Sequence, residues 1–471
     1  MDRRLKESLD RIFFPRSVAV AGVSREQDSP GSLLLRSLLD MGFEGKLYPV
    51  NPRYEEVMGL KCYPSIESLP GDVDLAILSV PPPAVPGLVG ECARAGVAGC
   101  VVNTAGFSET GREEGKLLEA EILGAMEGSN LRLVGPNCMG VYSSRGKVAL
   151  FAGMFPTQGR LCMISQSGSL ASITFLSALE RGLTFDRIVS SGNELDLNCT
   201  DFLEYFLEDP DVEMVLAYLE EIRDARRFLG VARRARGKIP VVLMKGGRTA
   251  GGKRAAASHT AALGGSSEIL VGALRQAGVI LVQDLGELLD VASALHHLPP
   301  AGGRRVAVVS SPGGLAVNAA DAVEEAGLEL SSLAPSTVET LREILPAEGT
   351  SPSNPVDLGF GAVRPGVYAR VLKAVAADPS VDVILAVGTA PASRKGDPGL
   401  LNAITEEMVQ AKGEVVKPMV AVFFPGSFLA TQFLRLHSAG IPAYPTPTSA
   451  CLALAHYLGF HSLRDASPSS T

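Results

Sequence analysis

The sequence lacks several features that would place it in a specialised class. It has no run of eighteen apolar residues, so we expect no helix that crosses a bilayer. The stretch MDRRLKESLDRIFF is charged and amphipathic, and it lacks the apolar centre of a secretory signal. The seven cysteines are scattered singly, without the close pairs that zinc or redox sites use. These absences favour a cytoplasmic protein with reduced, mostly buried thiols and no metal site.

The composition is that of an ordinary soluble globular protein. Of the 471 residues, 46% are hydrophobic and 20% are charged. The formal net charge of −8 argues against nucleic acid as a partner. The 50 glycines have no fixed period, which indicates many tight turns between strands and helices rather than disorder. The length allows about three domains.

Short apolar runs alternate with longer helical patterns along the first part of the chain. Such alternation predicts an α/β fold, with a parallel sheet that has helices on both faces. The continuous apolar runs suit strands that are buried on both sides. The predicted strands are 17–21, 46–50, 75–80, 99–103 and 131–134, and the predicted helices are 32–41, 84–95 and 113–126.

Two further α/β units are expected. The segment 296–305, HHLPPAGGRR, reads as a linker because its Pro-Pro and Gly-Gly pairs stop the elements on either side. The predicted domains are therefore 1–145, 146–297 and 304–464, with a disordered tail over 465–471. The predicted strands are 160–164, 187–190, 214–218 and 240–244 in the second domain, and 305–309, 383–387, 419–423 and 443–444 in the third.

The second and third units are internally similar. ISQSGSLASITFLSALERGL aligns without gaps on VSSPGGLAVNAADAVEEAGL, and two later segments align in the same order. This indicates two copies of one α/β domain. Each copy has a strand, a Ser-x-x-Gly turn and a helix, and the helix start offers unpaired N–H groups and a positive dipole end. We expect an anion site at each turn, so that two helix starts together hold one phosphoryl group.

His259 is the candidate catalytic residue. It lies in a segment of small and hydroxyl side chains, with Arg248, Lys253 and Arg254 shortly before it. An imidazole can act as a nucleophile toward a phosphoryl group, although a solvent-exposed loop histidine is the ordinary alternative. Glu220 ends a predicted strand at the ligand side of its sheet, where it would orient the imidazole; a solvated edge carboxylate is the alternative.

The first unit resembles a nucleotide-binding domain that lacks the G-x-G-x-x-G turn of dinucleotide-binding proteins. Its second strand ends in Asn-Pro-Arg53 rather than in a carboxylate. An arginine there favours a ligand with a phosphate on its ribose, such as NADP or coenzyme A. Pro81 begins a Pro-Pro-Pro ledge after the third strand, which is either a surface for an adenine ring or a simple strand stop.

Motifs in one fixed order span nearly the whole chain. They are FFPRSVAVAGVS, VNPR, VDLAILSVPPP, NTAGFSETG, GPNCMG, ISQSGSL, SGNELD, YLEEIRD, LMKGGRT, SHTAALGGS and NPVDLG. Together they resemble the α subunit of NDP-forming acyl-CoA synthetases, of the ADP-forming acetyl-CoA synthetase type, in the succinyl-CoA synthetase superfamily. The resemblance implies a Rossmann-like CoA-binding domain followed by two flavodoxin-like ligase domains.

The resemblance also implies roles for single residues. His259 would be the phosphorylated histidine, and Glu220 the carboxylate that steadies it. The loop reads SHTAALGG, with Ala261 where the family has glycine, and Pro312 alters the third-domain turn. The implied phosphate-binding residues are Ser167, Gly168, Ser169, Gly313 and Gly314, and the implied CoA-contacting residues are Gly22, Ser24, Arg53 and Pro81.

The function implied is the conversion of acyl-CoA, phosphate and ADP to acid, CoA and ATP through acyl phosphate and a phosphohistidine. No ATP-grasp segment is found in the 471 residues, so ADP or ATP with Mg²⁺ is expected on an ATP-grasp β subunit, in an α2β2 complex. The alternatives are a non-catalytic CoA-binding regulatory module and an NADP-dependent oxidoreductase. The acyl group, the choice between ADP and GDP and the direction of flux stay open.

Overall fold

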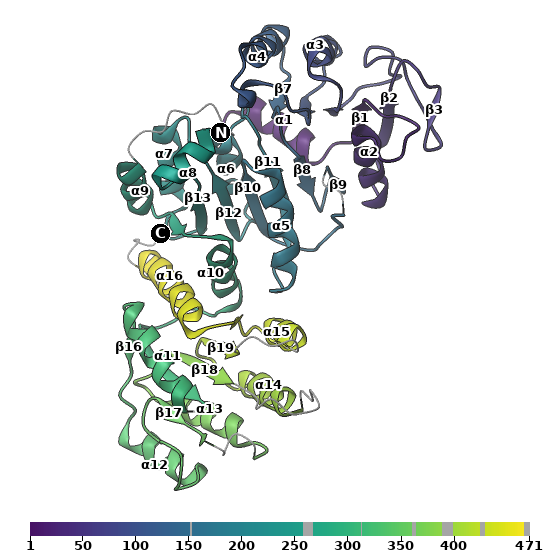
Figure 1. Ribbon diagram of the computed structural model, residues 1–471. Helices are drawn as coiled ribbons and strands as arrows, with labels where there is room; N and C mark the ends of the chain where they lie inside the picture. The colour runs from purple at the N-terminus through teal and green to yellow at the C-terminus, as the bar shows by residue number, and fades with distance from the viewer. Residues whose placement is uncertain are drawn as a thin grey trace. The chain divides into compact units, whose positions relative to one another are not determined.

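The computed structural model describes residues 1–150, 153–257, 267–311, 313–359, 364–388, 399–423 and 429–465. These residues confirm the α/β class, with three mainly parallel sheets and helices packed on them (Figure 1). The chain divides into two compact units, Met1–Leu176 with Thr184–Gln283 and Ser177–Leu183 with Asp284–Thr471. Unit 1 contains the first two sheets, and unit 2 contains the third.

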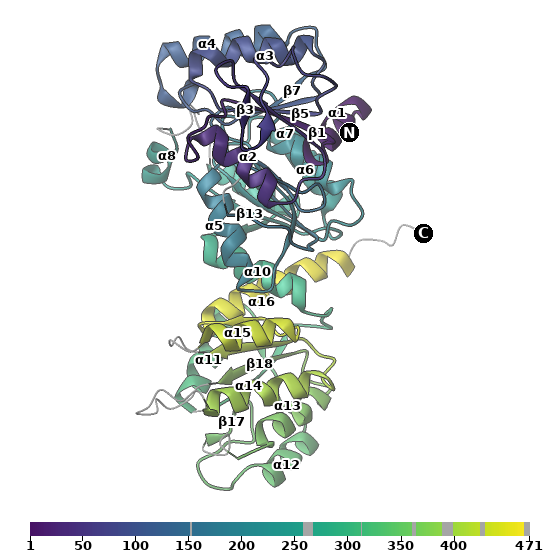
Figure 2. The ribbon, with the colours of Figure 1, turned by 90° about the vertical axis from the view of Figure 1, so that its right-hand side faces the viewer.

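The first sheet has five parallel strands in the order β2-β1-β5-β6-β7. The chain runs from β1 to β2 and then crosses to β5 on the other side, so the topological switch point lies between β1 and β5. Helices α3 and α4 lie side by side and cover one face (Figures 1 and 2), while α1 and α2 cover the other. The elements are α1 (Arg3–Phe13), β1 (Ser17–Ala21), α2 (Pro30–Asp40), β2 (Lys46–Val50), the hairpin β3 (Glu56–Val57) and β4 (Leu60–Lys61), β5 (Leu75–Leu78), η1 (Pro82–Ala84), α3 (Val85–Arg94), β6 (Gly99–Val102), η2 (Ser108–Thr110), α4 (Glu113–Met126) and β7 (Arg132–Val134).

The second sheet has seven strands in the order β14-β13-β12-β10-β11-β8-β9. Strands β10 to β14 are parallel, and β8 pairs antiparallel with β11. The switch point lies between β10 and β12, by the same path as in the first sheet. The predicted domain limit at residue 145 falls between β8 and β9. The elements are β8 (Gly140–Ser143), β9 (Val148–Ala149), β10 (Leu161–Ser165), α5 (Gly168–Leu179), β11 (Phe185–Ser190), α6 (Cys199–Leu207), β12 (Met214–Leu219), α7 (Ala225–Ala235), β13 (Val241–Lys245), α8 (Ala250–Ala257), α9 (Ser267–Gln276) and β14 (Ile280–Val282).

One hydrophobic core joins the two sheets of unit 1. It contains the apolar face of α1, the inner residues of β1 and β5, and residues of β8, β10 and α6. Phe13 of α1 stacks on Tyr205 at 5.5 Å between ring centroids and meets Phe206 at 5.6 Å. The buried Arg187 lies over the Tyr205 ring and pairs with Asp209 at 2.5 Å. Helix α1 therefore packs against both sheets.

Unit 2 has one six-stranded sheet in the order β16-β15-β18-β19-β20, with β17 paired to β15. Its switch point lies between β15 and β18. Residues 466–471 of the predicted tail lie outside the described residues, and Asp465 closes α16. The elements are α10 (Leu285–His297), β15 (Arg305–Ser310), α11 (Gly313–Glu325), β16 (Glu329–Leu330), α12 (Pro335–Ile344), β17 (Val356–Asp357), α13 (Val367–Ala377), β18 (Val383–Gly388), α14 (Gly399–Lys412), β19 (Met419–Phe423), α15 (Leu429–Ser438), β20 (Ala443–Tyr444) and α16 (Pro447–Asp465).

The predicted linker over 296–305 is wrong at its start. Helix α10 continues to His297 and ends just before the two prolines. His297 Nε2 lies 2.9 Å from the Arg181 carbonyl oxygen, and its ring stacks on His437 with centroids 5.5 Å apart. These contacts make the last turn of α10 part of the packing of unit 2, which a sequence pattern of His-His-Leu-Pro-Pro does not reveal.

Candidate functional site

The first switch point is built around a glycine at which a side chain would collide with the backbone. Gly22 follows β1 with φ +93°, and a Cβ placed on it would lie 2.0 Å from the Ser79 carbonyl oxygen. The Ser24 N–H donates to Ser32 Oγ at 2.9 Å, and Ser24 Oγ donates to Ser29 Oγ at 2.9 Å. The turn therefore places hydroxyl groups at the start of α2, where a helix favours an anion.

The four residues predicted to contact CoA lie at the carboxyl ends of three adjacent strands. Gly22 and Ser24 follow β1, Arg53 follows β2, and Pro81 follows β5. The Arg53 N–H donates to Asn51 Oδ1 at 2.9 Å. Its side chain is exposed and makes no ion pair with any described residue. A pocket of about 420 Å³ opens beside this turn, and it is lined by Ser24, Arg25, Gln27, Glu56, Val57 and Met58.

The second switch point carries Glu220, one residue beyond β12. The Tyr218 hydroxyl donates to Glu220 Oε1 at 3.0 Å, because residues two apart in an extended strand share a face. Glu220 Oε2 is buried and has no hydrogen-bond partner in the described structure. Burial and the neighbouring Glu220 charge raise the pKa of Tyr218, so its hydroxyl stays a donor. The carboxylate is thus held by one oxygen, and the other lacks a donor.

Gln166 holds the backbone of the same residue in place. Its Oε1 accepts the Glu220 N–H at 2.6 Å and the Glu221 N–H at 2.9 Å. Its Nε2 donates to the Glu221 carbonyl oxygen at 2.9 Å. Three hydrogen bonds therefore fix the peptide that follows β12 to the turn that follows β10. Sequence reasoning missed this role, although Gln166 lies inside the quoted ISQSGSL motif.

The turn after β10 also starts α5, which begins at Gly168. Ser167 Oγ and Ser169 Oγ lie 3.2 Å apart at this helix start. Ser165 Oγ donates to the Ser167 carbonyl oxygen at 2.6 Å, which tightens the turn. Ser167 and Gly168 are half-buried and Ser169 is exposed. The first four N–H groups of a helix have no partner within it, so this start offers amide and hydroxyl donors to an anion.

Glu194 is a second buried carboxyl near this turn that the sequence analysis did not single out. Its Oε1 accepts from Ser191 Oγ at 2.8 Å and from the Cys199 N–H at 3.1 Å. Its Oε2 is buried without a hydrogen-bond partner among the described residues. Burial raises the pKa of Glu194 to about 7. Only its place in the SGNELD motif could have drawn attention to it.

The third switch point, in unit 2, has a carboxylate where the second switch point has serine hydroxyls. A Cβ placed on Gly313 would lie 2.4 Å from Asp357 Oδ2, whereas one on Gly314 would meet nothing within 4 Å. Asp357 Oδ1 accepts the Gly359 N–H at 2.9 Å, and Ser311 Oγ donates to the Gly359 carbonyl oxygen at 3.0 Å. A carboxylate therefore lies against the start of α11.

His259, Ala261 and Pro312 lie outside the described residues. The described residues show where the segment with His259 leaves the second sheet. It follows β13, whose last residue Lys245 pairs in register with Leu219 of β12. The Lys245 ammonium donates to the Glu220 carbonyl oxygen at 2.5 Å. The segment thus begins on the strand next to Glu220.

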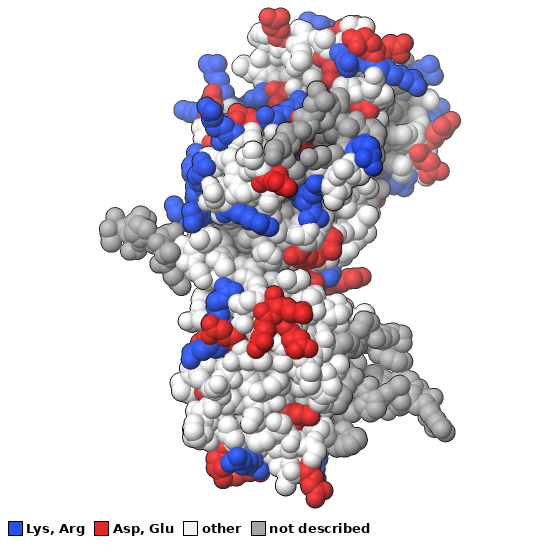
Figure 3. Space-filling model, turned by 60° about the vertical axis from the view of Figure 1, so that its left-hand side comes forward, with Lys and Arg blue, Asp and Glu red and all other residues white. Residues whose placement is uncertain are grey.

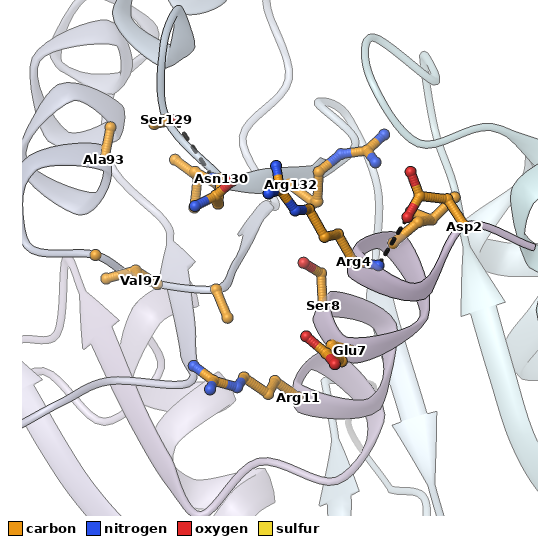
Figure 4. Close-up of a pocket in the computed structure, with 14 residues that line it drawn as sticks. Asp2, Arg4, Glu7, Ser8, Arg11, Ala93, Val97, Ser129, Asn130 and Arg132 are labelled. Carbon is orange, nitrogen blue, oxygen red and sulfur yellow. Dashed lines mark hydrogen bonds between the residues drawn. The ribbon is translucent and has the colours of Figure 1, made fainter.

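A larger pocket, of about 640 Å³, lies at the amino ends of the strands of the first sheet (Figure 4). Residues of α1 and of the turns before β6 and β7 line it, and Arg4 reaches into it toward Asn130. The amino ends of parallel strands are not where doubly wound sheets bind ligands, and none of the predicted site residues lines this pocket.

The described residues offer no group of three or more His, Cys, Asp or Glu side chains arranged to hold a metal ion. None of their helices combines the length and apolar character that a bilayer span requires. Among the described residues on the face in Figure 3, basic and acidic side chains are interspersed, and no continuous basic surface is seen there.

The chain is similar to known protein families along most of its length. Three family models match consecutive parts of the chain: a CoA binding domain over residues 16–144, a succinyl-CoA ligase like flavodoxin domain over 158–295, and a ligase-CoA domain over 306–461. These matches and the three doubly wound sheets define a CoA ligase.

Relatives narrow this class to a family. The α subunit of ADP-forming acetate–CoA ligase II from Pyrococcus furiosus is 36% identical over 447 residues, which cover 94% of this chain and 96% of that protein. ADP-forming acetate–CoA ligase I from Archaeoglobus fulgidus is also 36% identical, over 95% of this chain but only 63% of its own length. The solved structure of the dinucleotide forming acetyl-coenzyme A synthetase 1 of Ca. Korarchaeum cryptofilum, in complex with phosphate and ADP, matches with a TM-score of 0.87 and 33% identity, over 98% of this chain and 99% of that chain. The chain belongs to the ADP-forming acetate–CoA ligase family.

Proposed function

We propose that the chain is the α subunit of an ADP-forming acyl-CoA ligase that works with an ATP-grasp β subunit, in an α2β2 complex. The observation that carries the proposal is the carboxylate of Glu220. One oxygen is held by Tyr218, the backbone is fixed by Gln166, and the other oxygen is buried without a donor. An imidazole N–H is the kind of donor that such an oxygen lacks, and a carboxylate partner fixes the tautomer of a nucleophilic histidine.

The reaction has three steps. An oxygen of inorganic phosphate attacks the thioester carbonyl carbon; a C–O bond forms, the C–S bond breaks, and the CoA thiolate takes up a proton. A nitrogen of His259 then attacks the phosphorus of the acyl phosphate, so that an N–P bond forms and the acid leaves as its carboxylate. A β-phosphate oxygen of ADP finally attacks the phosphorus, which gives ATP and restores the imidazole.

Each predicted site residue has a role in this scheme. Ser167, Gly168 and Ser169 bind the phosphoryl group through amide and hydroxyl donors at the start of α5. Gly22, Ser24, Arg53 and Pro81 hold CoA at the carboxyl edge of the first sheet, with the exposed Arg53 guanidinium free to bind a phosphate of CoA. Gly313 and Gly314 are the second phosphoryl site, and ADP with Mg²⁺ binds on the β subunit.

The experiment is phosphorylation of the chain in a complex with its β subunit. The chain is co-purified with candidate β chains and incubated with ATP labelled at the γ-phosphate. This runs the last step backwards, from ATP to His259. We expect an acid-labile, alkali-stable label on the chain, and CoA release from acyl thioesters that depends on phosphate and ADP. His259→Ala is expected to abolish the label.

A matched control is His456→Gln, because His456 lies in unit 2 and pairs with Glu287 at 3.3 Å. This variant is expected to keep the label. If wild type binds CoA but takes up no label with any β chain, the chain is a CoA-binding regulatory module instead. If it binds NADP in preference to CoA, the ligase proposal is wrong.

A further inference from the structure

The loop between β7 and β8 lies where the ligand edges of the first two sheets meet. On the side of the first sheet, the Asn137 N–H donates to the Thr104 carbonyl oxygen at 2.9 Å. Asn103 Nδ2 donates to the Cys138 carbonyl oxygen at 2.7 Å. Both acceptor and donor come from the segment that follows β6, so the loop is tied to the carboxyl edge that the proposed CoA site uses.

The same loop is tied to the second sheet. The Met139 N–H donates to Ser190 Oγ at 3.1 Å, at the carboxyl end of β11. The Asn193 N–H donates to the Pro136 carbonyl oxygen at 2.9 Å, and a Cβ on Gly192 would lie 2.3 Å from that same oxygen. These hydrogen bonds and this close approach fix the loop from both sides.

Met139 is the side chain of this loop that meets the start of α5. A Cβ placed on Gly168 would lie 2.1 Å from Met139 Cγ and 3.1 Å from Met139 Cβ. Met139 is half-buried, so part of its surface is exposed. The Cβ and Cγ atoms of Met139 therefore lie directly against the first residue of the helix that is proposed to hold the phosphoryl group.

The chemistry requires the acyl group to be at this junction. In an acyl phosphate the acyl carbon is bonded to a phosphate oxygen, and in the preceding thioester the same carbon is bonded to the CoA sulfur. A phosphate at the start of α5 and CoA on the first sheet can share one carbon only where the two edges meet. We propose that Met139 forms the wall of the acyl pocket and determines the size of the acyl chain that the enzyme accepts; this rests on the proposed function.

A methionine is suited to such a wall because its unbranched, flexible side chain fills irregular space. Shortening it to alanine opens volume next to Gly168, and replacing it by phenylalanine closes volume. One methylene in an apolar pocket changes discrimination by about 10-fold to 200-fold. For Met139→Ala we therefore expect the kcat/KM ratio of hexanoyl-CoA to acetyl-CoA to rise by about 10-fold or more. For Met139→Phe we expect the ratio to fall by a similar factor.

The test uses the full α–β complex and measures CoA release with a thiol reagent across acetyl-, butanoyl- and hexanoyl-CoA. All seven cysteines of the chain are buried, so the chain itself contributes little thiol signal. Met126→Ala is the matched control, because Met126 is also half-buried but lies at the end of α4, away from the ligand edges. It is expected to leave the chain-length ratio unchanged.

Labelling of the chain by ATP separates this inference from the proposed function, because that step involves no acyl group. The Met139 variants are expected to keep the label, and the volume-conserving Met139→Leu is expected to keep the wild-type ratio within about threefold. If wild type is active and labelled, but Met139→Ala and Met139→Phe both leave the ratio within twofold, the inference is wrong. If wild type takes up no label and releases no CoA, the proposed function itself fails.

Discussion

The turn after β10 in unit 1 and the turn after β15 in unit 2 align residue for residue, yet different side chains surround them. At the first turn, Gln166 makes three hydrogen bonds to the peptide that carries Glu220. At the second turn the aligned residue is Ser311, whose side chain makes one hydrogen bond, to the Gly359 carbonyl oxygen. The backbone of the repeat has been kept, while the groups that face a ligand have diverged.

The charge at the two helix starts differs as well. Serine hydroxyls flank Gly168, and the carboxylate of Glu220, one residue beyond the adjacent strand β12, accepts a hydrogen bond from Tyr218. At Gly313 the carboxylate of Asp357 lies against the glycine itself. Because a carboxylate at that place repels an anion, we expect the start of α5 to bind phosphate more tightly than the start of α11. The comparison shows that the two copies of the fold keep a helix start at the same place but surround it with different polar groups.

The largest effect that separates the two turns is expected at their carboxylates. Glu220→Gln keeps the side-chain shape but removes the charge and turns one acceptor into a donor. We expect it to slow labelling of the chain by about 100-fold or more, since a positioned acid–base partner contributes 10²- to 10⁴-fold. Asp357→Asn is expected to change labelling by less than 10-fold. Equal losses in both variants would contradict the comparison; single-turnover labelling measures them.

The next effect is expected at the glycines. Gly168→Ala and Gly313→Ala each place a methyl group within 2.4 Å of a neighbour, so both are expected to lower the thermal midpoint. Gly314→Ala has open space, and replacing a helical glycine stabilises by about 0.5–1 kcal/mol. We expect Gly314→Ala to label about 10-fold more slowly without any loss of thermal stability. A Gly314→Ala variant with wild-type labelling would show that phosphate does not approach α11 there.

An effect at least as large as that of Gly314→Ala is expected at Gln166. Gln166→Leu removes all three hydrogen bonds to the residues after β12 and should slow labelling by about 10-fold to 100-fold, with KM for ATP little changed. Ser311→Ala removes one hydrogen bond in unit 2 and should change the rate by less than threefold. Gln166→Glu keeps the two acceptor bonds and loses only the donor bond, so it should recover part of the rate. If Gln166→Leu and Ser311→Ala had the same labelling rate, the two turns would not differ in function.

The pH dependence of stability should differ in sign between the two units. The pKa of Glu194 is raised to about 7, so the folded chain keeps a proton that the unfolded chain releases near pH 4.5. Stability of unit 1 should therefore fall by about 3 kcal/mol as the pH rises from 4.5 to 7. Glu194→Gln should remove this loss. Thermal unfolding between pH 4.5 and 8 measures it.

In unit 2, burial and the neighbouring His297 lower the pKa of His437 to about 4. Between pH 6.5 and pH 4, His437 is protonated in the unfolded chain but neutral in the folded chain. The stability of unit 2 should therefore fall as the pH drops from 6.5 to 4. His437 Nδ1 lies 3.2 Å from the Glu180 carbonyl oxygen, and its Nε2 accepts the Ala443 N–H. His437→Gln should flatten the acid limb. Hydrogen exchange read separately on the two units would reveal whether their trends run in the same direction.

Most strands could be predicted from the sequence because parallel strands covered on both faces are continuous apolar runs. The predicted strands 17–21 and 46–50 match β1 and β2 in full, and the others of the first sheet agree to within two residues. β8 and β9 were not predicted, because the four residues of β8 and the two residues of β9 contain no such long apolar run. The pairing of β8 with β11 depends on residues about fifty positions apart, which no local pattern contains.

The candidate site could be predicted less completely. The glycines and serines at the switch points follow from turn chemistry, and Glu220 from its place at the end of a strand. Tyr218 and Gln166, the partners of Glu220, could not be predicted from turn chemistry or strand position. Their hydrogen bonds depend on where the folded chain places their side chains. The role of His259 stays a prediction, since that residue lies outside the described part of the chain.

The position of α1 determines how the protein can be divided. Phe13 and its neighbours fill a space bounded by β1 on one side and by α6 on the other. A chain cut after residue 145 would take β8 away from its partner β11 and expose the aromatic cluster around Phe206 to water. Neither fragment would have a closed interior, so each is expected to aggregate when expressed alone. We therefore expect the two sheets of unit 1 to fold and unfold as one cooperative unit.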